Sequence, residues 1–268
     1  MFGLRPAPDL CRPGLQWFNV DRPLTMADLR GRLVVLDFWT GCCVNCLNVQ
    51  ETLKRVSAAF ADPAVVVVGV HSPKFPHERE PEAVAHAIER YDIRHPVVHD
   101  PDMLLWNAYG VRGWPTLVFV GPDGKVLGDL PGEPNAEKLI SGIGRMVQGW
   151  RCGSQAEPPA PLPITARPDE NGARGTRLRY PTKIKPLAPV GGQRRWVCAD
   201  SGHHQIVILD DDGRELGRFG SGEPGFIDLG AGDSAFNGPQ GLVANGRSVF
   251  VADTGNHAIR RVTGSGVV

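Results

Sequence analysis

The sequence lacks the features that mark secreted, membrane-spanning and nucleic-acid-binding proteins. Residues 1–21 contain no basic stretch followed by an apolar run, and no segment approaches the roughly 18 apolar residues of a membrane helix. Lys+Arg and Asp+Glu are equal at 29 each, so the chain has no excess charge to attract DNA, RNA or an anionic membrane. We therefore expect a cytoplasmic protein with no nucleic-acid or membrane partner.

Disulfides that stabilise structure are rare in the cytoplasm, so the six cysteines need another explanation. Three of them, Cys42, Cys43 and Cys46, fall within five residues, while the others are scattered along the chain. Clustering indicates catalysis or metal binding, whereas scatter is typical of small buried residues.

Composition divides the chain into three parts. Residues 1–150 alternate apolar runs with amphipathic stretches, and residues 151–178 contain five prolines and little apolar periodicity. From residue 179 the pattern changes to short strands between glycine-rich turns, and 16 of the 33 glycines lie beyond residue 190. We predict an α/β domain, a proline-rich linker and an all-β segment over 179–268.

Strands alternate with helices in the first part, and a hairpin and a last helix follow. This order predicts a three-layer α/β domain with a central mixed sheet. The expected strands are 33–39, 65–70, 116–120 and 126–130, and the expected helices are 44–60, 81–91, 102–109 and 135–148.

Cys43 and Cys46 form a C-x-x-C at the junction of a strand and a helix. The first cysteine would lie at the helix N-terminus, where free N–H groups and the helix dipole stabilise a thiolate. The second, one turn later, could attack a mixed disulfide made by the first. We therefore assign Cys43 as the nucleophile and Cys46 as the resolving thiol.

Two further features fit the same site. Asp37 lies on an otherwise apolar strand, so its carboxyl should be buried beneath the helix, with a raised pKa, where it can exchange a proton with the resolving thiol. Pro115 precedes a strand, where a cis-proline would expose backbone groups to a substrate peptide. Trp39, Trp114 and Cys42 adjoin these residues in sequence and are accessory candidates.

These motifs resemble the thioredoxin superfamily, specifically its TlpA/ResA-like branch. The resemblance implies a thioredoxin fold in which the counterparts of Cys43, Cys46, Asp37 and Pro115 are the attacking thiol, the resolving thiol, the buried acid and the cis-proline. No cofactor or metal is implied. The sequence departs from the usual pattern at Cys42, where the superfamily has tryptophan.

Cys42 leaves three alternatives open: a bystander, a third redox thiol or part of a metal site. A disulfide between Cys42 and Cys43 would be strained, because adjacent cysteines do not easily reach relaxed disulfide geometry. A zinc site would need a further ligand such as His71 or His99, and no spacing supports either. We expect both histidines to pack at strand ends.

Two segments of the tail repeat, at 196–206 and 250–259, each a strand, a polar turn and a second strand. They resemble NHL repeats, whose polar Asp and His residues we expect to brace the turns. With a doubled cysteine in the redox motif, the whole arrangement resembles the NHL-repeat-containing thioredoxin-like proteins. The resemblance implies a protein partner for the repeats.

About two NHL repeats precede Val268, whereas such propellers usually close with about six blades. The sequence therefore looks like the front part of a longer protein or a truncated product. We expect an incomplete propeller that is poorly packed, self-associates or depends on further blades. A tail as resistant to limited proteolysis as residues 1–150 would refute this expectation.

The favoured activity is thiol–disulfide exchange on protein or small-molecule disulfides. One alternative is a scaffold that binds partners through the NHL repeats and has idle cysteines. A lesser alternative is a thiol peroxidase, since Thr40-x-x-Cys43 resembles the T-x-x-C of peroxiredoxins. Leu36 stands where the proline of that motif is expected.

Overall fold

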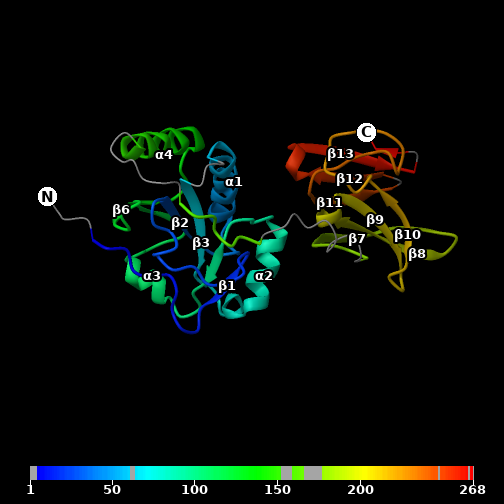
Figure 1. Cartoon of the computed structure of the whole chain (residues 1–268). Helices are drawn as coiled ribbons and strands as arrows, with labels where there is room; N and C mark the ends of the chain where they lie inside the picture. The colour runs from blue at the N-terminus through cyan, green and yellow to red at the C-terminus, as the bar shows by residue number, and fades with distance from the viewer. Residues whose placement is uncertain are drawn as a thin grey trace. The chain divides into compact units, whose positions relative to one another are not determined.

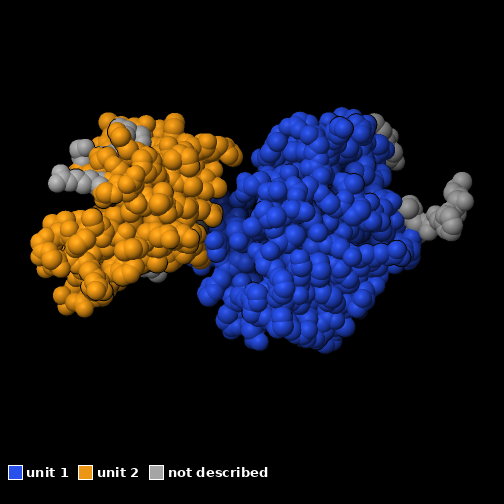
Figure 2. Space-filling model, turned by 180° about the vertical axis from the view of Figure 1, so that it is seen from behind, with its two compact units in different colours: residues 1–168 blue, residues 169–268 orange. Residues whose placement is uncertain are grey.

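The computed structural model describes residues 5–60, 64–151, 159–165, 177–246, 248–264 and 266–267. The chain divides into two compact units, residues 1–168 and residues 169–268, which are coloured separately in Figure 2. Each unit has its own sheet or sheets and its own buried apolar residues. No helix within the described ranges is long and apolar enough to span a membrane.

The first unit is built on one six-stranded mixed sheet with the strand order β1-β4-β3-β2-β5-β6. Strands β1, β2, β3 and β6 are labelled in Figure 1. Strands β2, β3 and β4 are parallel, while β1, β5 and β6 run antiparallel to their neighbours. The strands are β1 (Gln16–Phe18), β2 (Leu33–Trp39), β3 (Val65–His71), β4 (Val97–His99), β5 (Thr116–Val120) and β6 (Val126–Pro131).

Helices cover both faces of this sheet, because strands such as β2 have apolar side chains on both faces. The even-numbered residues of β2 belong to one apolar cluster, together with residues of α3 and of the N-terminal segment. Its odd-numbered residues Leu33 and Val35 belong to another, with α1 and α4. Because successive side chains of a strand point to opposite faces, Asp37 and Trp39 also lie on the α1 side. The helices are α1 (Val44–Ala59), α2 (Pro81–Arg90), α3 (Leu104–Tyr109) and α4 (Ala136–Arg151).

The predicted three-layer α/β fold is confirmed, with elements that differ from the expected ones at a few ends. The short helix begins at Leu104 rather than residue 102, and α4 continues to Arg151. Two three-residue strands, β1 and β4, were not predicted from the sequence. They are too short to show an alternating pattern, and pairing with each other and with β3 makes them strands.

The predicted linker over 151–178 falls largely outside the described residues, which here include 159–165 and 177–178. The described stretch 159–165 lies along the first unit. Ile164 pairs with Val20, and the Asp21 amide donates to the Pro163 carbonyl at 3.0 Å. This part of the proline-rich stretch is therefore held along the first unit by backbone hydrogen bonds.

The second unit contains two four-stranded antiparallel sheets, ordered β10-β9-β8-β7 and β11-β12-β13-β14. Residues from both sheets form one buried cluster that includes Val197, Phe236 and Val251. The strands are β7 (Pro181–Val190), β8 (Gln193–Asp200), β9 (Gln205–Asp210), β10 (Glu215–Phe219), β11 (Pro239–Asn245), β12 (Ser248–Asp253), β13 (Ala258–Thr263) and β14 (Gly266–Val267).

The two predicted repeats have the same local structure. In each, a strand ends at an aspartate, a 3-10 turn follows, and a histidine in the left-handed conformation leads into the next strand. The two aspartates are Asp200 and Asp253, and the two histidines are His204 and His257. Although the sheets share a core, Ile259 is 71% exposed, and several other aliphatic side chains of this unit are also exposed. The expected self-association stays a prediction.

Candidate functional site

Cys43 and Cys46 lie where β2 passes into α1. Cys43 is the N-cap residue of α1, in an extended backbone conformation, and its carbonyl accepts the first helical hydrogen bond, from Leu47. Cys43 is half-buried and Cys46 is buried, and both are free thiols. Burial raises the pKa of Cys46, and its hydrogen bond with the Cys43 side chain raises it further. The first residue of the pair is therefore partly exposed, and the second is covered.

Asp37 lies on β2 beneath α1 and is completely buried. Burial raises the pKa of its carboxyl to about 7, and a hydrogen bond from Gln50 opposes that rise. The Gln50 Nε2 atom donates to Asp37 Oδ2 at 2.6 Å, while Oδ1 has no partner among the described residues. The negative charge of Asp37 in turn raises the pKa of Cys46. The ionisation of Asp37, which titrates near neutral pH, is therefore coupled to the ionisation of the resolving thiol Cys46.

Pro115 follows a cis peptide bond from Trp114 and immediately precedes β5. The adjacent Thr116 pairs with Phe38 of β2, which brings this segment next to the end of the strand that leads to the cysteines. Trp114 Nε1 donates to the Ser72 carbonyl at 3.0 Å.

Trp39 is fully buried in one apolar cluster with Cys46, and the partly buried Cys43 and Trp114 pack against that cluster. All four principal candidates and their tryptophan neighbours thus lie in one region, on β2, at the start of α1 and beside β5.

Cys42 is exposed and is bound by Glu78, a residue that the sequence did not single out. Glu78 belongs to the 3-10 turn η1 (Pro76–Arg79) and is 4% exposed. The Cys42 thiol donates to Glu78 Oε2 at 3.1 Å, and Thr40 Oγ1 donates to Oε1 at 2.5 Å. No local sequence pattern predicts this contact, because Glu78 lies 36 residues after Cys42 in a polar segment.

His71 and His99 lie at the ends of β3 and β4 and are buried, as the sequence predicts for packing residues. Their Nδ1 atoms are 3.2 Å apart, and His71 Nε2 is 3.8 Å from Glu78 Oε1. Among the residues that the structure describes, no group of three or more His, Cys, Asp or Glu side chains is arranged to hold a metal ion.

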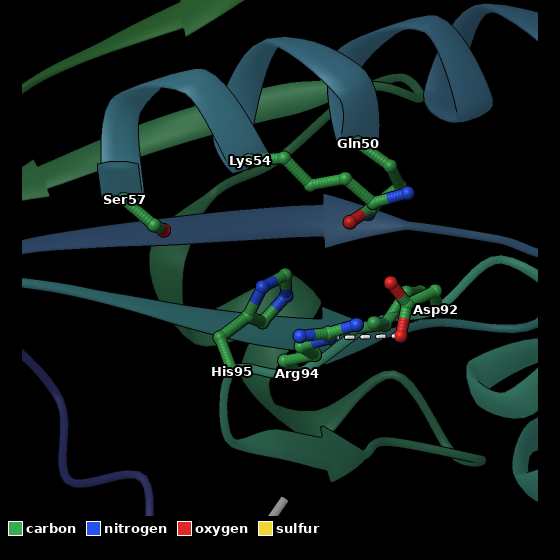
Figure 3. A pocket seen from close by; sticks show the side chains of 7 residues that line it. Gln50, Lys54, Ser57, Asp92, Arg94 and His95 are labelled. Carbon is green, nitrogen blue, oxygen red and sulfur yellow. Dashed lines mark hydrogen bonds and ion pairs between the residues drawn. The ribbon is translucent and has the colours of Figure 1, made fainter. Parts of the chain in front are cut away.

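A pocket of about 380 Å³ lies between α1 and the segment that precedes β4 (Figure 3). Gln50, which donates to Asp37, lines it from α1, and His95 lines it from the opposite side. Burial lowers the pKa of His95 to about 4, and its Nε2 atom has no partner among the described residues. The other lining residues are Lys54, Ser57, Asp92, Ile93 and Arg94. The pocket therefore reaches the side chain that contacts the buried acid.

The aspartates of the repeats in the second unit hold turns, as expected. Asp200 Oδ2 lies 2.8 Å from His203 Nδ1, and its Oδ1 accepts from the Arg179 amide. Asp253 Oδ2 accepts from Asn256 at 2.7 Å and from Arg260 at 2.8 Å. Of the scattered cysteines, Cys11 is exposed in the first unit and Cys198 is buried in the second, while Cys152 is outside the described residues.

Comparison with protein-family models assigns both parts of the chain. A thioredoxin-like model matches residues 31–126, and an NHL-repeat model matches residues 236–261. This chain combines a thioredoxin-like domain with an NHL repeat. The thioredoxin-like match includes Asp37, Pro115 and the cysteine cluster, and the NHL match includes the second of the two repeated segments.

Two curated relatives match nearly the whole chain, including both the thioredoxin-like domain and the NHL repeat. SUPPRESSOR OF QUENCHING 1, chloroplastic, from Arabidopsis thaliana is 38% identical over 252 residues, covering 92% of this chain and 24% of that protein. NHL repeat-containing protein 2 from Gallus gallus is 37% identical over 257 residues, covering 95% of this chain and 34% of that protein. The chain thus spans about a quarter to a third of the length of these relatives.

The thioredoxin-like domain also matches smaller proteins. The crystal structure of the thioredoxin-like superfamily protein SPOA0173 is 27% identical with a TM-score of 0.51, covering 58% of this chain and 100% of that one. The thiol-disulfide oxidoreductase ResA of Bacillus cereus is 25% identical over 118 residues, covering 44% of this chain and 65% of ResA. The domain is therefore related to thiol–disulfide oxidoreductases, which supports a redox role at that coarse level.

Proposed function

We propose that this chain is a thiol–disulfide oxidoreductase in which Cys43 attacks and Cys46 resolves. The observation that carries the proposal is the contrast between the two thiols of one C-x-x-C. Cys43 is half-buried at the start of α1, whereas Cys46 is buried within reach of the charge of Asp37. An accessible thiol suits attack on a substrate, and a covered thiol suits attack on the mixed disulfide.

The proposed reduction of a substrate disulfide balances in two steps. The Cys43 thiolate attacks one substrate sulfur, the substrate S–S bond breaks, and the departing sulfur takes a proton from water. The Cys46 thiol then gives its proton to Asp37 and attacks the Cys43 sulfur, which releases the second substrate sulfur as a thiolate. The substrate gains two electrons, and the chain keeps a Cys43–Cys46 disulfide. Oxidation of a substrate dithiol runs the same steps in reverse.

Asp37 fits the role of proton acceptor because its pKa of about 7 leaves a substantial ionised fraction at neutral pH. A carboxyl with an ordinary pKa would be ionised but a weak base, and one with a much higher pKa would already hold a proton. Pro115 and Trp114, at the start of β5 beside this site, are proposed to contact the substrate.

The proposed substrates are protein or small-molecule disulfides, and the NHL repeats are proposed to bind a protein partner. We propose that the chain has no nucleic-acid or membrane partner, because its positive and negative side chains balance. We propose a cytoplasmic location on the basis of its cysteine pattern, three clustered and three scattered. The relation to thiol-disulfide oxidoreductases supports the first proposal, and the NHL match supports the second.

Reduction of insulin disulfides by dithiothreitol tests the activity. We expect the full chain to accelerate the reaction, and Cys43→Ser and Cys46→Ser to return it to the rate of dithiothreitol alone. Cys11→Ser is the matched control, since Cys11 is an exposed thiol that follows Leu10, whose apolar cluster covers the sheet face opposite α1. Activity indifferent to both site substitutions would refute the redox function and favour the scaffold alternative.

A further inference from the structure

Glu78 has a neighbourhood composed almost entirely of hydrogen-bond donors. Its Oε1 accepts from Thr40 Oγ1 at 2.5 Å and from the Cys42 amide at 3.2 Å. Its Oε2 accepts from the Cys42 thiol at 3.1 Å, from the Lys74 amide at 3.0 Å and from the Phe75 amide at 3.2 Å. A carboxylate accepts hydrogen bonds at both oxygens, whereas a carboxylic acid must donate one. Five donors and no acceptor therefore define an ionised side chain.

The charge of Glu78 is retained despite burial. Burial alone raises the pKa of Glu78, but the nearby His71 ring and the hydrogen bonds from Thr40 and Cys42 bring it below its usual value. Burial lowers the pKa of His71, so this neighbour is a neutral imidazole at physiological pH. The negative charge nearest the Cys42 sulfur is thus a fixed one.

Glu78 also connects two segments that are far apart in sequence. It binds Thr40 and Cys42 of the loop that runs into α1, and it binds the amides of Lys74 and Phe75, which follow β3. Cys43 is the next residue after this loop. Removing the carboxylate would release three backbone amides, one hydroxyl and one thiol at the same time.

We propose that Glu78 is a positioning residue that binds the Cys42 thiol and amide, holds Cys42 as a neutral thiol, and keeps it out of the disulfide chemistry at Cys43 and Cys46. The part of this proposal that concerns Cys43 and Cys46 rests on the proposed function. The effect of Glu78 on the protonation of the Cys42 thiol does not depend on it. A carboxylate at 3.1 Å disfavours a second negative charge on the sulfur, and a neutral thiol is a poor nucleophile. The exposed cysteine beside the nucleophile is therefore kept unreactive by its partner.

The test measures the alkylation rate of Cys42 by iodoacetamide between pH 6 and 10. It uses the full chain carrying Cys43→Ser and Cys46→Ser, and peptide mass spectrometry separates Cys42 from the other thiols. We expect the rate to have its midpoint above pH 8.5, the ordinary pKa of a cysteine. Glu78→Gln should lower that midpoint by about one pH unit or more, which makes alkylation about tenfold faster at pH 7.5.

Glu80→Gln is the matched control, because Glu80 is exposed and lies two residues away. It should leave the midpoint unchanged. A midpoint at or below pH 8.5 in the chain that retains Glu78 would overturn the proposal without any need for the Gln variant to fold. Equal midpoints with Glu78 and with Gln in the folded variant would also overturn it. Because this background has neither redox cysteine, failure of the insulin assay would leave the alkylation result standing.

Discussion

Replacing Asp37 by asparagine tests the electrostatics of the site without removing a thiol. The carboxyl is completely buried, and its pKa is raised from 3.8 to about 7. At 1.36 kcal/mol per pH unit, that rise corresponds to about 4 kcal/mol of destabilisation when the carboxyl is ionised in the folded protein. Asparagine has nearly the same size and can still accept from Gln50, so the substitution removes mainly the charge.

The sign of the pH dependence follows from the raised pKa. Below pH 3.8 the Asp37 carboxyl is protonated in both the folded and the unfolded protein, and it does not reduce the free energy of unfolding. Between pH 4 and 7 unfolding releases the proton, so the free energy of unfolding of the wild type falls as the pH rises. Above pH 7 the loss is complete. Relative to the wild type, Asp37→Asn should therefore gain about 2.5 kcal/mol more stability at pH 8 than at pH 5.

Urea unfolding of the reduced protein, followed by tryptophan fluorescence, measures this difference. Five of the six tryptophans belong to the first unit, and Trp196→Phe in both proteins removes the signal of the second. A phosphine reductant, which does not depend on a thiolate, keeps the cysteines reduced at both pH values. A stability difference between Asp37→Asn and the wild type that is the same at pH 5 and pH 8 would refute a pKa near 7.

Three further substitutions test contacts inside each unit. Gln50→Leu removes the hydrogen bond that lowers the pKa of the buried carboxyl, so that pKa should rise by about one unit in an NMR titration. Arg260→Met leaves a buried aspartate without its cation and should destabilise β12 and β13 by about 3 kcal/mol or more in amide hydrogen exchange, whereas the exposed Arg261→Ala should not. Gly255→Ala would place a Cβ atom 2.6 Å from a backbone oxygen and should destabilise the same strands by about 1–3 kcal/mol. Exchange rates equal to those of the wild type would contradict the second and third predictions.

The sequence predicts the elements whose residues carry their own signal. The apolar run that forms β2 and the C-x-x-C that follows it define the strand, the helix start and the positions of both thiols. Asp37 is recognisable because a single charge interrupts that run, and its burial follows from the strand's period of two. The repeated segments of the tail are recognisable in the same way, since each places a polar turn between two apolar strands.

Contacts between distant segments carry no such signal. Glu78 lies in a polar stretch where a carboxylate usually faces solvent, and only the packing of η1 against the loop before α1 makes it a buried partner of Cys42. The hydrogen bond from Gln50 to Asp37 depends in the same way on how α1 lies across β2. The three-residue strands β1 and β4 exist because neighbouring strands pair with them.

Trapping the mixed disulfide tests thiol–disulfide exchange at the Cys43–Cys46 pair most directly. The full chain carrying Cys46→Ser is incubated with oxidised glutathione, and peptide mass spectrometry locates the adduct. The proposed mechanism predicts one glutathione on Cys43, removable by dithiothreitol, and none at this site in Cys43→Ser. An adduct carried by Cys42 instead, or no adduct on either cysteine, would contradict it.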